Sequence, residues 1–134
     1  MIWIAVALIV VGAGLAYVRL APHDVARWHA MPQDLTPRDL TGGAVRVVEG
    51  DAAVLARLDA IIRATPRTRV LAGSVESGMI TYVTRSAVFG FPDYTTVRLE
   101  EGRIALYGRL RFGASDMGVN AARIDGWLRE LPAG

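Results

Sequence analysis

The chain opens with a run of apolar residues, Ile2 to Val18, that contains no charged side chain. A helix rises about 1.5 Å per residue, so this run spans about 25 Å of the roughly 30 Å hydrocarbon core of a bilayer. The next residues complete the span, because Arg19 can bury its aliphatic stem and extend its guanidinium to the headgroups. Trp3 and Tyr17 border the run, as aromatic residues border membrane helices. The pattern predicts a transmembrane anchor over residues 1–21 and a tethered domain after it.

A cleaved signal peptide is the main alternative to a retained anchor. Gly14-Leu15-Ala16 loosely fits the small-x-small cleavage rule. No Lys or Arg precedes the apolar run, so the positive n-region of a signal peptide is missing and the anchor is favoured. Arg19, Arg27 and Arg38 follow the run, and by the positive-inside rule they favour a cytoplasmic domain.

The composition of the chain excludes several classes of function. It contains no cysteine, which excludes disulfides, iron–sulfur clusters, thiolate zinc sites and cysteine nucleophiles. All fifteen basic residues are arginine, and thirteen acidic residues leave a net charge of only +2. With so small a charge and no matching motif, nucleic-acid binding is not expected.

The remainder of the chain reads as one connector followed by one domain. Residues 22–43 contain three prolines and two glycines, which predicts an irregular connector. Within it, Trp28 either docks at the membrane surface or covers the edge of the domain's core. Residues 44–134 form the predicted domain.

Hydrophobic periodicity predicts the elements of that domain. Asp51 has the chemistry of an N-cap, and apolar residues recur at helical spacing from Val54 to Ile62. Two-residue turns at Ser77-Gly78 and Glu101-Gly102 separate β-rich runs, as in tight hairpins. The expected strands are 46–48, 69–75, 79–86, 94–100 and 103–112, and the expected helices are 51–64 and about 117–131. The fold class is α+β: after the transmembrane helix, a four- to five-stranded antiparallel sheet packs with two helices on its apolar face.

Alternation along the last two strands predicts a basic and aromatic sheet face. Ile104 and Leu106 point to the core side, whereas their neighbours in the sequence point away from it. The outward set combines arginine, which binds phosphate and carboxylate in bidentate fashion, with tyrosine. Its members are Tyr94, Arg98, Arg103, Tyr107, Arg109 and Arg111. This face is either an anion-binding surface or simply the solvated side of the sheet.

Two smaller groups complete the candidate residues. Asp93 is expected to accept a hydrogen bond from Arg85 across a hairpin. Beside them, Phe91 either walls a pocket or fills the core next to an ordinary turn. Asp116, Asn120 and Arg123 gather at the start of the last helix. They either hold an anion or cap the helix and tie it to the sheet.

Several segments, in this order, resemble a known bacterial family. They are Arg19–Pro22, Thr65–Thr68, Ile80–Ser86, Gly90–Tyr94, Gly108–Gly113 and Ser115–Asn120 through Arg123. Together they resemble the family catalogued as domain of unknown function 1499. The resemblance implies a small, often membrane-anchored protein with no established activity and no catalytic residues to transfer. Some relatives look like exported lipoproteins, which favours the outer side, but this chain lacks the lipobox cysteine.

No motif in the sequence indicates catalysis. The serines lack a Gly-x-Ser-x-Gly elbow, and His23 and His29 match no common metal-ligand spacing. We therefore expect no cofactor, no metal and no catalytic residue. The predicted function is a non-catalytic binding or assembly module in a bacterial inner membrane, spanning it once with residues 2–21 and contacting an anionic lipid, a glycan or a protein. The alternative is an enzyme or lipid-ligand carrier with a site between the sheet and the start of the last helix; the side of the membrane stays open.

Overall fold

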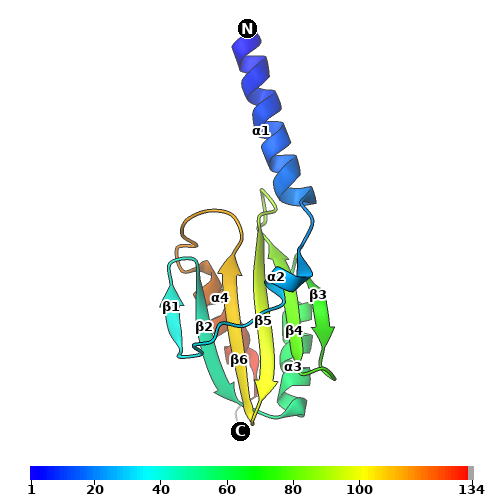
Figure 1. The fold of residues 1–134 in the computed structure, drawn as a ribbon, viewed down its shortest axis with the longest axis vertical. Helices are drawn as coiled ribbons and strands as arrows, with labels where there is room; N and C mark the ends of the chain where they lie inside the picture. The colour runs from blue at the N-terminus through cyan, green and yellow to red at the C-terminus, as the bar shows by residue number, and fades with distance from the viewer. Residues whose placement is uncertain (133–134) are drawn as a thin grey trace.

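Six antiparallel strands and four helices make up the computed structural model, which describes residues 1–132. The helices are α1 (Ile2–Leu20), α2 (Val25–Trp28), α3 (Ala52–Arg63) and α4 (Val119–Glu130). The strands are β1 (Arg38–Leu40), β2 (Gly43–Glu49), β3 (Thr68–Ser74), β4 (Met79–Arg85), β5 (Pro92–Glu100) and β6 (Arg103–Leu110). They form one sheet in the order β1-β2-β6-β5-β4-β3 (Figure 1). The predicted α+β class is confirmed, with six strands in place of the four or five expected.

Helix α3 forms where its periodicity predicts. The Asp51 carboxylate accepts a hydrogen bond from the Val54 amide at 3.0 Å, which satisfies one of the free donors at the helix start. Leu55, Leu58 and Ile62 lie on one stripe and are fully buried against the sheet. The helix therefore begins and ends within a residue of its predicted bounds.

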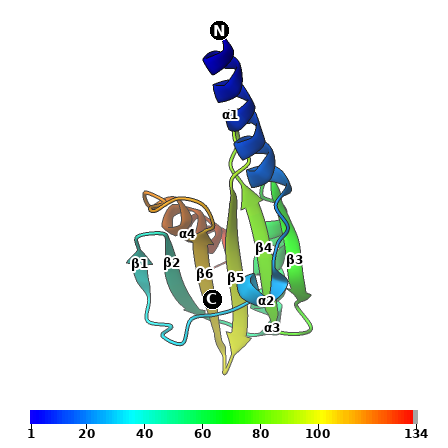
Figure 2. The same ribbon diagram turned by 45° about the horizontal axis from the view of Figure 1, so that its top comes forward.

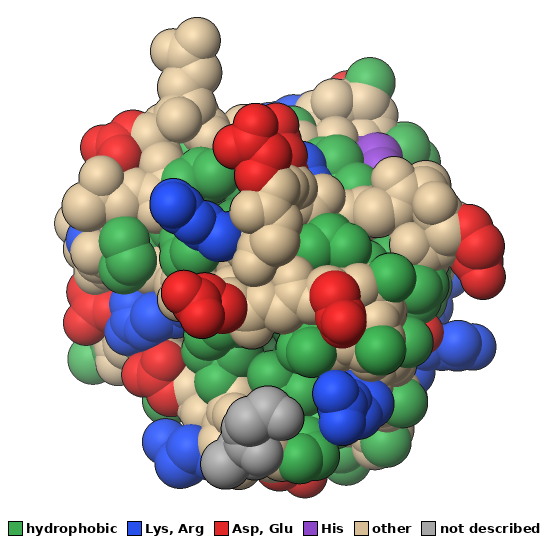
Figure 3. Space-filling view, turned by 90° about the horizontal axis from the view of Figure 1, so that it is seen from below, with side chains coloured by type: hydrophobic (Ala, Val, Ile, Leu, Met, Phe, Trp, Pro, Cys, Tyr) green, Lys and Arg blue, Asp and Glu red, His purple; other side chains and the backbone are tan. Residues whose placement is uncertain are grey.

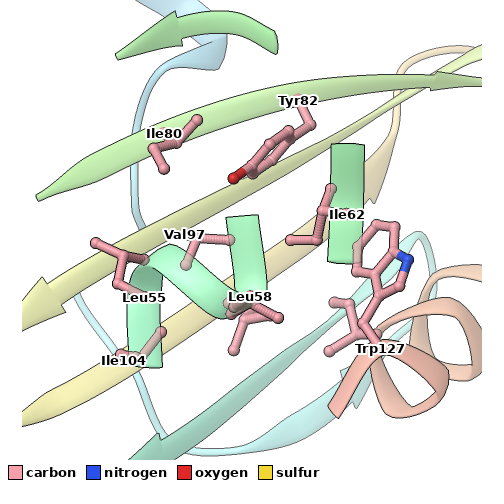
Figure 4. Close-up of a cluster of buried hydrophobic side chains, with 10 residues drawn as sticks. Leu55, Leu58, Ile62, Ile80, Tyr82, Val97, Ile104 and Trp127 are labelled. Atoms are coloured by element: carbon pink, nitrogen blue, oxygen red, sulfur yellow. The ribbon is translucent and has the colours of Figure 1, made fainter. Parts of the chain in front are cut away.

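The main core lies between the sheet and the pair of helices α3 and α4 (Figure 4). Its buried members are Leu55, Leu58, Ile62, Ile80, Tyr82, Val97, Ile104, Leu106, Ile124 and Trp127. The two polar aromatics keep partners: Tyr82 donates to Asp59 at 2.7 Å, and the Trp127 indole donates to Thr65 at 2.8 Å. Burial and the Asp59 contact raise the pKa of Tyr82, so its hydroxyl stays protonated and continues to donate.

The β5–β6 turn shows why the sheet meanders. Glu101 and Gly102 have φ angles of 52° and 75°, the two positive values that a two-residue hairpin turn requires. This turn pairs Glu100 with Arg103 and sets the register of both strands. Val97 thus lies opposite Leu106 on the core face, as the alternation predicts.

The segment over residues 22–43 corrects the expectation of an irregular connector. It contains α2, capped by Asp24, and β1, which pairs with β2 at the sheet edge. Between these elements it crosses the sheet face opposite α3 and α4 (Figure 2). Trp28 stacks on Tyr94 there, with ring centroids 4.1 Å apart and planes 11° from parallel. Both faces of the sheet are therefore covered. Helices α3 and α4 cover one face, and the short connector with Trp28 covers the other.

Helix α1 projects from one end of the domain (Figure 1). It is long and apolar enough to cross a membrane, and none of its residues is buried. Only its last turns contact the domain: Tyr17 meets Phe112 edge-on, and Arg19 donates to the carbonyls of Val88 and Phe89. These contacts place the β4–β5 loop beside the end of α1.

Replacing Leu58 with Ala should lower the free energy of unfolding by about 2–5 kcal/mol, because the cavity left in a close-packed core cannot fully collapse. Urea unfolding of the full chain in detergent micelles measures this change. The exposed neighbour Arg57→Ala is the matched control and should change stability by less than about 0.5 kcal/mol. Equal losses in both variants would contradict the placement of the core.

Candidate functional site

The predicted basic and aromatic sheet face exists but is not an open surface. Tyr94 is fully buried and Arg109 is only 8% exposed, because the connector with Trp28 lies over them. The prediction of an outward, accessible face is corrected for these two residues. The alternation of residues along β5 and β6 correctly assigns side chains to the two faces of the sheet. It carries no information on which segment covers the face opposite the core.

Arg109 joins the connector to the sheet. Its guanidinium donates to the carbonyls of Trp28 and Ala30 and to the Thr96 hydroxyl, the last at 2.8 Å. It also lies 4.4 Å from the centroid of the Tyr107 ring. Burial lowers the pKa of Arg109 to about 10, so the group stays charged at neutral pH. Carbonyl dipoles and aromatic rings solvate this cation, which gives it a structural role.

The other members of the predicted face are divided between different partners. Arg98 pairs with Glu100 at 2.9 Å near the far end of the sheet. Arg111 donates to the Pro22 carbonyl at 3.0 Å and to the Tyr94 hydroxyl at 3.1 Å, next to the end of α1. The face therefore does not act as one continuous binding surface.

The second predicted group, at the start of α4, forms a closed polar cluster with Asp93. Arg123 donates to Asp93 at 3.2 Å and to the Asn120 side-chain oxygen at 2.9 Å. Asn120 donates to Asp116 at 3.0 Å, and Asp116 also accepts from the Asn120 and Gly118 amides. Burial raises the pKa of Asp93, against the opposing effect of Arg123. The cluster caps α4 and ties it to β5, which is the structural alternative of the two predicted for it.

The expected contact between Asp93 and Arg85 is wrong. Asp93 pairs in register with Thr84, so it shares the helix-covered face with that residue, and Arg85 points to the opposite face. Phe91 also departs from both of its predicted roles, since it contacts Phe89 and is 39% exposed. The expected Asp93–Arg85 contact fails because neighbouring residues of a strand point to opposite faces, and Arg85 pairs with Pro92 rather than with Asp93.

A hollow beneath the end of α1 brings together four arginines from distant parts of the sequence. We call it the arginine pocket. Its volume is about 530 Å³. It is lined by Arg19, Arg67, Thr68, Arg69, Val83, Arg85, Ser86, Ala87 and Gly90. Arg19 comes from α1, Arg67 from the turn just before β3, Arg69 from the start of β3, and Arg85 from the end of β4.

Backbone carbonyls accept hydrogen bonds from three of the four arginines of the pocket. Arg85 donates to the Gly90 carbonyl at 2.9 Å and Arg67 donates to the Arg85 carbonyl at 3.0 Å. Gly90 has a φ of 73°, and a Cβ there would lie 3.2 Å from Arg19, so glycine permits the close approach of loop and helix. Arg67 itself adopts a left-handed φ of 58°, an uncommon conformation for a side chain of its size.

No carboxylate among residues 1–132 pairs with any of these four arginines. The pKa of the neighbouring His23 responds to this positive charge. Its pKa is lowered, first by burial and then by the positive charges of Arg85, Arg69 and Arg111. The pocket thus concentrates positive charge that nothing within the described chain neutralises.

Sequence reasoning identified one of the four arginines, Arg85, and missed Arg19, Arg67 and Arg69 as site residues. The Thr65–Thr68 turn contributes to the family resemblance but carries no pattern that indicates a site. No local pattern joins an arginine at the end of an apolar helix to a turn almost fifty residues later. Tertiary structure alone brings them together.

A second hollow lies at the opposite end of the connector-covered face. Its volume is about 620 Å³, and it is bounded by residues 33–37 and the far ends of β2, β5 and β6. Arg98 and Arg103 share its lining with Glu49, Glu100 and Glu101. This mixture of charges gives no preference for an anion, in contrast to the arginine pocket.

The profile of the family described as "Protein of unknown function (DUF1499)" matches residues 22–131. The chain belongs to this family. The DUF1499 match begins just after α1 and includes the connector, so the connector is part of the family's domain.

No curated protein matches this DUF1499 chain. Among solved structures, the crystal structure of a DUF4468 family protein from Bacteroides ovatus is similar, with 13% identity and a TM-score of 0.35. The likeness covers 66% of this chain and 63% of that one, so the DUF1499 chain spans less than two thirds of its length. A likeness of this size establishes no shared function.

Trp28→Ala should release the connector, because it removes the stacking on Tyr94 and costs about 3–5 kcal/mol of stability. Hydrogen exchange of the amides in residues 22–37 should become faster in the full chain. Val25→Ala, on the exposed side of the same short helix, is the control and should leave exchange unchanged. Unchanged exchange in Trp28→Ala would show that the stacking does not hold the connector.

The connector contact at His23 should weaken in mild acid. Its ring lies 2.6 Å from the Tyr94 hydroxyl and accepts from Arg85 at 3.3 Å, an arrangement that requires a neutral imidazole. The folded pKa lies below the ordinary 6.5, so the stability contributed is complete above 6.5 and is lost as pH falls through the lowered value.

Urea unfolding of the full chain above and below pH 6.5 measures this loss. In His23→Gln the loss on acidification should be smaller than in the parent, since the remaining titration comes from other groups. An identical loss in both proteins would contradict the role of His23.

Proposed function

We propose that this chain is a membrane-anchored binding module whose domain lies with its α1 end against the bilayer surface. The observation that carries the proposal concerns α1, which has no buried residue and no charged residue before Arg19. This helix leaves the domain at the end where exposed apolar loop residues gather with arginines that have no carboxylate partner in residues 1–132. A retained anchor at this point brings that end, and no other, to the lipid headgroups.

Exposed apolar side chains at this end support the proposal. Val88 is 71% exposed and Phe89 is 51% exposed in the β4–β5 loop, and Met117 is 91% exposed in the loop before α4. The β4–β5 loop rises toward the last turn of α1, and the loop between β6 and α4 lies at the same end of the sheet (Figure 1). We call Val88, Phe89, Phe91 and Met117 the apolar rim. Aromatic and aliphatic side chains at this level are typical of groups that dip into a membrane interface.

The charge distribution supports the same orientation. The arginine pocket and Arg111 lie at the α1 end, and no described carboxylate pairs with them. At the opposite end, acidic and basic side chains are intermixed (Figure 3). Basic residues near an anionic leaflet contribute about 1 kcal/mol each to attraction. The α1 end is therefore the electrostatically suitable one.

The membrane proposed is the cytoplasmic membrane of a bacterium, as the family resemblance implies. The positive charge after α1 favours the cytoplasmic side. The partner is proposed to be an anionic group at this surface. The polar cluster around Asp93 is satisfied internally and lines none of the larger hollows described, so nothing favours the enzymatic alternative.

Single-cysteine labelling tests this orientation cleanly, since the chain has no cysteine of its own. A fluorophore on Val88→Cys in the full chain, reconstituted in vesicles, should be quenched by nitroxide-bearing lipids and shielded from aqueous iodide. The matched control is Glu76→Cys, in the β3–β4 turn at the far end. A fluorophore there should be quenched by iodide and not by nitroxide-bearing lipids.

Two outcomes would contradict the proposal. Equal access of iodide to both labels would show that the α1 end does not lie on the bilayer. Extraction of the unprocessed chain by buffer without detergent would remove the anchor itself.

A further inference from the structure

We infer that the arginine pocket binds the phosphate monoester group of a ligand, presented either by a lipid headgroup or by a soluble phosphate compound. This inference rests on the proposed function, which places the pocket at the bilayer surface, and it specifies the chemical class of the ligand. Its basis is the convergence of Arg19, Arg67, Arg69 and Arg85 on one hollow.

The donors in the pocket are only partly used by the protein. Arg19 and Arg85 are held mainly by backbone carbonyls, and Arg67 uses one nitrogen to reach the Arg85 carbonyl. The terminal nitrogens of Arg67 and the whole guanidinium of Arg69 make no hydrogen bond within residues 1–132. Rigid arginines beside free ones form a prepared set of donors with space between them.

The charge of the pocket selects among anions. None of the four guanidinium cations has a carboxylate partner in the described chain. A carboxylate or phosphodiester carries one negative charge, whereas a phosphate monoester carries about 1.5 to 2 and offers three strong acceptor oxygens. The monoester therefore neutralises more of the charge and engages more of the free donors.

The shape of the pocket indicates that the phosphate carries an attached group. About 530 Å³ lies within the roughly 300–1,000 Å³ of small-molecule sites and exceeds what one phosphate fills. Val83 and Ala87 supply apolar lining beside the arginines. Arg19, at the last turn of α1, borders the same hollow, so acyl chains of a bound lipid would run beside α1 toward the bilayer.

The test compares lipids that differ only in the headgroup, using the full chain in neutral detergent micelles. Phosphatidic acid is the monoester probe, phosphatidylglycerol the diester, and phosphatidylcholine the neutral reference; glycerol phosphate in water is the soluble probe. Calorimetric titration should show phosphatidic acid binding at least about tenfold more tightly than phosphatidylglycerol, because the additional charge-assisted hydrogen bonds are strong.

The variant Arg67→Gln/Arg69→Gln should lose this binding by about tenfold or more. Arg57→Gln/Arg129→Gln removes the same charge from exposed positions on α3 and α4 and should retain it. Both pairs are exposed, so folding is expected to survive in each. An equal loss in the two variants would overturn the pocket and leave only general attraction to a negative surface.

The His23 imidazole gives an independent readout. Burial, and after it the charges of Arg85, Arg69 and Arg111, lower the pKa of His23, and Tyr94 is its other neighbour. A bound dianion should neutralise part of that field and raise the pKa of His23 in an NMR titration, an effect absent from Arg67→Gln/Arg69→Gln.

Each remaining outcome is decisive. Binding of glycerol phosphate without preference for phosphatidic acid would support the monoester site and assign it to a soluble ligand. Failure of both probes while the Val88 label is still quenched by lipid would overturn the pocket and leave the membrane orientation standing.

Discussion

The Trp28 ring stacks on the Tyr94 ring, and this contact determines where α1, the helix long and apolar enough to span a membrane, joins the domain. With Arg109 holding the carbonyls of Trp28 and Ala30, the stacking fixes the path of residues 22–31 across the sheet. A proline-containing segment without such anchors would act as a loose tether. Because it is anchored, α1 leaves the domain at one defined place, and Arg19 reaches the loop that Arg85 also holds.

The positive charges of the arginines in this chain are balanced in two different ways. Arg46 and Arg123 pair with carboxylates, which is the usual way to balance a partly buried cation. Arg109 has no carboxylate partner among the described residues and is solvated by carbonyls, a hydroxyl and aromatic rings. Arg67 has one carbonyl contact through a single nitrogen, and Arg69 has neither kind of compensation within residues 1–132. Since both lie beside α1, the source of compensation that fits them best is outside the protein.

Local patterns in the sequence account for most of the fold. The N-cap at Asp51, the helical stripe after it and the alternation of β6 depend on neighbours within a few residues, so they could be predicted correctly. The start of α4 was placed about two residues early, because Asp116 caps the helix from outside it by holding the Gly118 and Asn120 amides. These errors are small because the governing interactions are local.

The candidate site could not be predicted in the same way. Alternation showed that Tyr94 and Arg109 leave the core face, but whether water or another segment meets them depends on contacts across more than sixty residues. The strand β1 was missed because three residues at a sheet edge carry no periodic signal. The arginine pocket was missed for the same reason, since its members share no spacing.

The rigid attachment of α1 has a consequence for the kind of ligand this end can receive. A domain on a flexible linker samples many orientations, and its binding face meets soluble and membrane-bound ligands alike. Here the connector is packed, so the arginine pocket stays within a side chain's reach of the last turn of α1. Ordering of the segment has already occurred on folding, and a ligand at the interface meets Arg19 and Arg85 already held by backbone carbonyls. The same packing that buries Trp28 therefore also fixes the place where α1 leaves the domain, and with it the position of Arg19 beside the other arginines of the pocket.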